Sequence, residues 1–212
     1  MSGPTEPDPL ELAALLCSRV CHDLISPVGA IVNGLEVMED NADEETKTFA
    51  LELIKKSTAS ASARLQFCRL AFGAAGSAGA QIDTGDAESV ARGFLEDGKT
   101  KLEWSVPRVL LAKNRVKLLL NLLIISGQAI PRGGNLSVQP EGTGDTMGFR
   151  ITANGPNSRV PGPAAAILDG TSEHAVDAHA VQPYYTGLLA KSCGLALTLA
   201  AEGENIVLSA RP

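Results

Sequence analysis

Apolar residues return every three or four positions over one long stretch, from residue 10 to residue 39. They are Leu12, Leu16, Val20, Leu24, Val28, Ile31, Leu35 and Met38. This spacing is typical of an amphipathic α-helix with one apolar face. A polar turn ends the pattern, and Asp43, followed by two glutamates, is a good N-cap for a second helix over residues 44–72.

Two helices joined by a short turn form a hairpin, which is too thin to bury a core alone. Pairing two such hairpins into a four-helix bundle is the simplest solution, so we expect a homodimer. The alternative is that the hairpin packs on its own C-terminal domain. The Gly/Ala/Ser run at residues 73–79 is typical of a flexible linker, and it favours the dimer.

A histidine stands beside a carboxylate on the first helix. At about 100° per residue, His22 lies about 160° around the helix from Val20 and Leu24, so its imidazole is expected to face solvent or a partner. Pro27 cannot donate to the Asp23 carbonyl and predicts a kink in the helix. A kink one turn after an exposed histidine indicates a reactive position.

From residue 80 onward, strand and helix patterns alternate. Strands are expected at residues 81–83, 101–106, 136–139, 147–153, 195–200 and 205–210, and helices at 86–96, 114–130, 164–168 and 183–193. This order suits an α/β sandwich with one helical layer. The predicted fold is therefore α+β, with a disordered N-terminus at 1–9, a helical hairpin at 10–76 and an α/β domain at 80–212.

Composition narrows the range of partners. The formal charge of −6 disfavours a nucleic-acid-binding surface. The longest apolar run, residues 118–125, is far shorter than the roughly 20 residues of a membrane span. Residues 1–9 lack the basic and apolar regions of a signal peptide. We therefore expect a cytoplasmic protein that binds neither nucleic acid nor membrane.

The potential metal ligands lack the spacing of a metal site. The four cysteines are Cys17, Cys21, Cys68 and Cys193. Cys17 and Cys21 are expected to pack as small apolar residues and to stay reduced. His174 and His179 have acidic neighbours, but no helix or strand fixes their spacing, so a polar loop is expected there. No metal bound by this chain is predicted.

The run His22-Asp23-Leu24-x-Ser26-Pro27-Val28-x-x-Ile31 resembles the H-box of sensor histidine kinases, His-Glu/Asp-Leu-x-x-Pro-Leu-x-x-Ile. A helical hairpin followed by a mixed α/β domain is similar to their dimerisation and phosphotransfer domain and their Bergerat-type ATPase domain. The resemblance covers nearly the whole chain. It implies a dimeric four-helix bundle followed by a histidine-kinase-like α/β sandwich.

The second half departs from a working kinase in three nucleotide-binding boxes. Kinases carry Asn-Leu-x-x-Asn-Ala on the long helix, and its second Asn ligates magnesium. This chain keeps Asn121 but has Ile125 at the metal position, which offers no oxygen. The Asp-x-Gly-x-Gly box is replaced by Ala153-Asn154-Gly155-Pro156-Asn157, and the phosphate-binding turn around residues 181–187 holds a single glycine. These losses predict a degenerate ATPase domain and no bound cofactor.

An intact H-box on a kinase-like scaffold without an ATP site is similar to the ChpT-type histidine phosphotransferases of the bacterial cell-cycle phosphorelay. The resemblance implies that His22 takes phosphate from the receiver aspartate of a hybrid kinase (CckA-like). His22 would then pass it to the receivers of response regulators (CtrA-like and CpdR-like). Magnesium is expected on the receiver, not on this chain.

The resemblance makes His22 the phosphorylated nucleophile. A histidine side chain has an ordinary pKa of about 6.5, so the neutral imidazole dominates in the cytoplasm and its outer nitrogen can attack. Asp23 is expected to orient the ring or to accept its proton. Arg19 is a candidate to pair with the phosphoryl group, or it is an ordinary solvated charge. Ser26 is a candidate to hydrogen-bond the phosphoryl group or an attacking water.

Other residues near the histidine are candidates for supporting roles. Ser18 shares the face of His22, Pro27 provides the kink, and Gly29 leaves room for a docking receiver. Four basic residues of the second helix are candidates to contact an acidic receiver surface: Lys55, Lys56, Arg64 and Arg69.

Two other functions stay open at this point. The chain could be an active sensor histidine kinase core with unusual nucleotide boxes, which autophosphorylation with ATP would reveal. It could also be a non-catalytic receiver-binding scaffold in which His22 is incidental. Phosphorelay through His22 is the prediction that explains both the intact H-box and the altered boxes.

Overall fold

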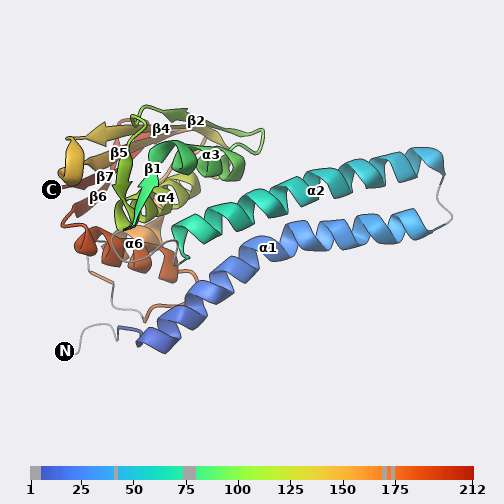
Figure 1. The fold of residues 1–212 in the computed structure, drawn as a ribbon, viewed down its shortest axis with the longest axis horizontal. Helices are drawn as coiled ribbons and strands as arrows, with labels where there is room; N and C mark the ends of the chain where they lie inside the picture. Colours follow the sequence, from blue (N-terminus) through green and yellow to red (C-terminus); the bar gives the residue numbers. More distant parts are fainter. Residues whose placement is uncertain (1–5, 41–42, 74–79, 169–170, 173–174) are drawn as a thin grey trace.

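In a computed structural model, a long helical hairpin extends from an α/β domain (Figure 1). The structure describes residues 6–40, 43–73, 80–168, 171–172 and 175–212. The hairpin consists of α1 (Pro9–Glu39) and α2 (Glu44–Ala71), each capped by an aspartate. Asp8 accepts hydrogen bonds from two backbone N–H groups of α1, and Asp43 accepts one from Thr46. These bonds satisfy donors that have no partner inside the helix. Residues 1–5 of the expected disordered N-terminus and 74–79 of the expected linker lie outside the described part.

The first helix changes direction about halfway along its length, in the region that contains Pro27 (Figure 1). Proline there removes one backbone hydrogen bond, which explains the bend. Pro27 is buried, as is Gly34 further along the helix. A Cβ atom added to Gly34 would lie 2.6 Å from Ile54 Cγ1 and 3.3 Å from the Ala50 carbonyl oxygen. The two helices therefore approach closely at Gly34, where the absence of a side chain leaves space.

The main sheet of the α/β domain has five strands in the order β2–β4–β5–β7–β6. Strand β2 (Thr100–Trp104) runs parallel to β4 (Gly134–Glu141), and all other neighbours are antiparallel. The remaining strands are β5 (Gly148–Asn154), β6 (Ala196–Glu202) and β7 (Asn205–Arg211). A short 3₁₀ helix, η1 (Gly144–Thr146), lies between β4 and β5.

Helices cover one side of this sheet (Figure 1). They are α3 (Thr84–Leu95), α4 (Lys113–Gln128), α5 (Gly162–Leu168) and α6 (Val181–Ser192). The elements expected from the sequence are present with ends shifted by at most two residues. One strand was missed: β3 (Leu110–Ala112), which pairs with β1 (Gln81–Asp83) in a separate two-stranded sheet. Three residues are too few to show a period, so only this pairing defines β3.

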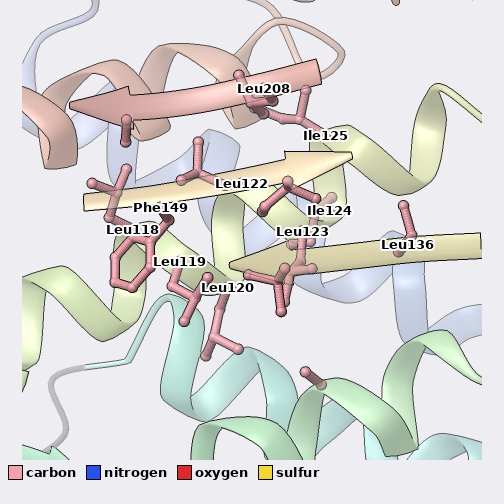
Figure 2. Close-up of a cluster of buried hydrophobic side chains, with 14 of the residues drawn as sticks. Leu118, Leu119, Leu120, Leu122, Leu123, Ile124, Ile125, Leu136, Phe149 and Leu208 are labelled. Carbon is pink, nitrogen blue, oxygen red and sulfur yellow. The ribbon is translucent and has the colours of Figure 1, made fainter. Parts of the chain in front are cut away.

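Helix α4 forms the centre of the core, and every residue from Arg115 to Ser126 is buried. Figure 2 shows its leucines and isoleucines beside the strands that carry Leu136, Phe149 and Leu208. Phe67 and Ala71 of α2 belong to the same cluster and are fully buried. The last turns of the hairpin therefore pack on its own α/β domain, while the rest of the hairpin extends away from it.

Candidate functional site

His22 projects from the middle of α1 into solvent, as the helical spacing predicted. Its side chain is 82% exposed, and its Nδ1 atom lies 3.4 Å from Oδ1 of Asp23. The Asp23 side chain is only 9% exposed, and its charge reaches Cys68 of α2. The site therefore combines a solvent-accessible imidazole with a largely buried carboxylate beside it.

Asp23 is fixed from its other side by Arg19, one turn earlier on the same helix. Arg19 Nε donates to Asp23 Oδ2 at 3.2 Å, in a partly buried contact. Both carboxylate oxygens thus face a partner. When Nδ1 of the imidazole carries the proton and points at Asp23, the lone pair lies on Nε2 and faces solvent. This is the arrangement that a histidine nucleophile needs.

The facing part of α2 supplies a buried thiol and a second arginine. Burial and then the negative charge of Asp23 raise the pKa of the Cys68 thiol to about 11, while Arg19 and Arg64 act to lower it. The charges of Arg19, Asp23 and Arg64 therefore all lie near Cys68. Arg64 is half-buried.

The other candidate residues of α1 lie around His22 without bonding to it. Ser18 and Ser26 are exposed, and within the described residues 6–40 neither hydroxyl hydrogen-bonds the ring. A Cβ atom added to Gly29 would have no atom within 4 Å, so this glycine borders open space. On α2, Lys55, Lys56 and Arg69 are exposed.

A groove of about 420 Å³ opens between the base of α1 and α2. Its lining includes the three thiols of the hairpin, Cys17, Cys21 and Cys68, together with Phe72 and Arg69. Cys17 and Cys21, which were expected to pack as small apolar residues and to stay reduced, are free thiols and are exposed in this single chain. Arg69 also lines this groove, whereas Arg64 is not among its lining residues in the described part of the chain.

The residues that match the first nucleotide box are sealed inside the α/β domain. Asn121 is fully buried and donates to the backbone carbonyls of Ala71 and Lys117. Its side-chain oxygen accepts a hydrogen bond from Gln182 Nε2 at 2.5 Å. Ile125 is also fully buried in the core. This asparagine therefore ties the end of α2 to α4 and α6, with no side-chain group left for a ligand.

The other two boxes are likewise built into the fold. Ala153 is buried within β5, and Asn154 Nδ2 donates to Asn205 Oδ1 at 2.7 Å. A hollow of about 660 Å³ adjoins residues 154–160 and the β6–β7 turn, but no residue of α4 lines it within the described part of the chain. Residues 181–187 are the first turns of α6, where Gln182 and Thr186 are fully buried.

Sequence reasoning did not identify two side-chain contacts that involve residues of the α/β domain. Phe94 of α3 lies against Arg64, and Gln182 of α6 supports Asn121. Both contacts join residues far apart in the chain, and no local spacing signals them. Within the described residues, no group of three or more His, Cys, Asp or Glu side chains is arranged to hold a metal ion.

By length and composition, α1 is the one helix in the described part of the chain that could cross a membrane. It is paired with α2, and its apolar window is not buried in the protein. Core helices and signal sequences meet the same criterion, so this finding is weak evidence for membrane insertion.

Comparisons with known proteins agree on one family. The family model of the histidine phosphotransferase C-terminal domain matches residues 84–205. The protein phosphotransferase ChpT of Brucella abortus (strain 2308) is 53% identical over 211 residues, which covers 99% of this chain and all of that protein. A solved structure of a bacterial phosphotransferase has 51% identity and a TM-score of 0.89, and it covers 99% of this chain and all of the other.

Proposed function

Because this chain belongs to the histidine phosphotransferase family, its activity is phosphotransfer in a phosphorelay, and we propose that His22 carries the phosphate. Its partners belong to two-component signalling. The observation that supports the role of His22 most strongly is an exposed imidazole whose Nδ1 faces a carboxylate held by Arg19. No second histidine is needed for the relay, since transfer to and from aspartate uses one nucleophile in both directions.

In the first step, the lone pair on Nε2 of His22 attacks the phosphorus of an aspartyl phosphate on a donor receiver. The P–N bond forms as the P–O bond to the receiver aspartate breaks, and that aspartate leaves as a carboxylate. The imidazole gains positive character, which the negative charge of Asp23 stabilises through Nδ1–H. Arg19 keeps Asp23 in place for this role.

In the second step, the aspartate carboxylate of an acceptor receiver attacks the same phosphorus. The P–N bond breaks, and its electron pair returns to Nε2 of His22. Magnesium and most of the charge neutralisation come from the receiver. The resemblance to the ChpT type points to a CckA-like hybrid kinase as donor and to CtrA-like and CpdR-like regulators as acceptors.

We further propose that this chain binds no ATP and no metal of its own. Three features support this: the internal hydrogen bonds of Asn121, the buried Ile125, and a helix where kinases place a glycine-rich turn. The hollow beside residues 154–160 lacks any wall from α4, which carries the metal ligand in kinases.

The active assembly is proposed to be a homodimer with a four-helix bundle. Of the apolar stripe on α1, Val28 and Leu35 are 48% and 49% exposed in the single chain, and the neighbouring Ile25 is 72% exposed. Exposed apolar stripes of this length mark surfaces that bind another protein. A second hairpin would cover them. Light scattering is expected to give a dimer mass for the full chain and a monomer mass for Val28→Lys.

The protein is proposed to act in the cytoplasm, where receiver domains work. A membrane-spanning α1 would place the Arg19–Asp23 pair and His22 at bilayer depth, where charged and polar groups are costly. Their position beside α2 fits an aqueous hairpin instead.

One experiment with two arms tests the phosphorelay role. In the first arm, the chain is incubated with γ-labelled ATP and magnesium. In the second arm, it is incubated with a receiver domain that is already phosphorylated. We expect label only from the receiver. Label from ATP alone would support the kinase alternative, and label from neither source would support a binding scaffold.

A further inference from the structure

Arg64 of α2 is held by an aromatic ring from the α/β domain. Its guanidinium carbon lies 5.4 Å from the centroid of the Phe94 ring. Phe94 belongs to α3 and stacks on Phe67 of α2, with ring centroids 4.1 Å apart and planes 20° apart. On the other side, Arg64 Nε donates to Ser60 Oγ at 3.4 Å. The side chain is thus held by both α2 and the α/β domain.

Arg64 keeps an unneutralised charge. Within the described residues, no carboxylate oxygen lies within 4.0 Å of its guanidinium, whereas Arg19 and Arg92 each pair with a carboxylate. Stacking on a ring holds the plane of a guanidinium but leaves its N–H donors free at the edges. Those donors remain able to bind an anion.

The register of the hairpin places Arg64 at the level of His22. Gly34 of α1 faces Ala50 and Ile54 of α2. The two helices are antiparallel, so moving toward the start of α1 corresponds to moving toward the end of α2. His22 lies twelve residues before Gly34, and Arg64 lies ten to fourteen residues after residues 50–54, so the two are at the same level of the hairpin. The charges of Arg64, Arg19 and Asp23 also act together on the pKa of the buried Cys68 thiol. Two independent observations therefore place Arg64 beside the site.

We propose that Arg64 binds the acidic, phosphate-carrying surface of a receiver domain that docks at His22, and that Phe94 holds the Arg64 side chain in position for this contact. This inference rests on the proposed role of His22 and assigns the α/β domain a part in transfer. An aspartyl phosphate and the acidic residues that bind its magnesium are strongly negative. Arginine is suited to such partners, because the paired N–H donors of its planar guanidinium match the spacing of carboxylate and phosphate oxygens. Arg19 differs from Arg64 in that its charge is already paired with a carboxylate, that of Asp23.

The test measures kcat and KM for phosphotransfer from a phosphorylated receiver with Arg64→Gln, Phe94→Leu and the double variant. Arg132→Gln is the matched control, because it removes the same charge from an exposed position in the turn between α4 and β4. We expect Arg64→Gln to lower kcat/KM about tenfold at low salt, mainly through KM, and the loss to shrink at high salt. Arg132→Gln should change kcat/KM less than twofold.

The double variant separates positioning from simple packing. If Phe94 acts through Arg64, Phe94→Leu lowers kcat/KM, but adding it to Arg64→Gln causes no further loss. Phe94→Tyr keeps the ring and should transfer normally. Thermal melting of each variant comes first, and Phe94→Met replaces Phe94→Leu if the latter is unfolded at the assay temperature.

Three results would overturn the inference. They are normal transfer by Arg64→Gln, an equal loss in Arg132→Gln, and losses that multiply in the double variant. These outcomes are distinct from failure of the proposed function, which would show as phosphate transfer that persists in His22→Ala.

Discussion

Arg19 Nε lies 3.2 Å from Oδ2 of Asp23, one turn later on α1, and this contact is partly buried. The same carboxylate turns its other oxygen toward Nδ1 of His22. The two contacts form a chain from Arg19 through Asp23 to the imidazole. We propose that Arg19 acts on His22 by holding its neighbour Asp23.

Replacing Arg19 with glutamine should slow transfer without unfolding the protein. A partly exposed ion pair four residues apart in a helix contributes about 0.5 kcal/mol, so the fold should survive. Without the pair, Asp23 loses its fixed orientation, and kcat should fall about tenfold while KM stays the same. Single-turnover kinetics with a phosphorylated receiver measures both. A rise in KM at unchanged kcat would instead make Arg19 a docking contact.

The reactivity of Cys68 should report the charge of Asp23. Burial and then that charge raise the pKa of the thiol from its ordinary value of 9.0 to about 11. Alkylation of Cys68 should therefore still be rising about tenfold per pH unit at pH 10, where an ordinary thiol has levelled off. Asp23→Asn removes the negative charge, so the curve should move to lower pH. Peptide mass spectrometry measures each cysteine separately, and a Cys68 curve that levels off near pH 9 would contradict the placement.

Two glycines of α1 should respond in opposite ways to alanine. Gly34→Ala places a Cβ atom 2.6 Å from Ile54 Cγ1, and we expect the free energy of unfolding to fall by about 1–3 kcal/mol. In Gly29→Ala the added Cβ atom has no other atom within 4 Å, and alanine has a better helix propensity than glycine. The free energy of unfolding of this variant should therefore rise by about 0.5–1 kcal/mol. Transfer by Gly29→Ala should nevertheless slow, because the added methyl group enters the space proposed for the receiver.

Urea unfolding and transfer rates together check both variants. If the Gly29→Ala variant is more stable and transfers phosphate at the normal rate, the receiver does not dock on the face of α1 that carries Gly29. Gly34→Ala that keeps full stability would contradict the close approach of the helices.

Restoring the kinase residue at position 125 should not restore a kinase. Ile125→Asn puts an amide without partners into a fully buried apolar site, at a cost of about 3 kcal/mol or more. Asn121 stays bonded to Ala71 and Gln182, so no nucleotide site opens. Urea unfolding should show the loss of stability, and labelled ATP should not bind. A stable variant that binds ATP would contradict the proposed loss of the nucleotide site.

Much of this fold could be predicted from local patterns. The periodicity of residues 10–39 and 44–72 gives the hairpin, because a helical face repeats within a few residues. His22 and its outward direction follow from the same spacing. Strand β3 could not be predicted, because it exists through pairing with β1 and has no period of its own.

The partners of individual side chains were the part that sequence could not provide. The ion pair of Arg19 with Asp23 is an exception, because the two residues stand four apart on one helix and this spacing could have predicted it. Asn121 looked like a remnant of a nucleotide box, yet its side chain holds the end of α2 through the Ala71 carbonyl. The contact of Phe94 with Arg64 joins two domains, so no window of sequence contains it.

The most direct test of the central claim compares the wild type with His22→Ala, using a phosphorylated receiver as the donor. Wild type should gain an acid-labile label, and peptide mapping should place it on the segment that contains His22. His22→Ala should fold, dimerise like the wild type and gain no label. Equal labelling of His22→Ala would contradict the account, because the phosphate would then be carried by another residue.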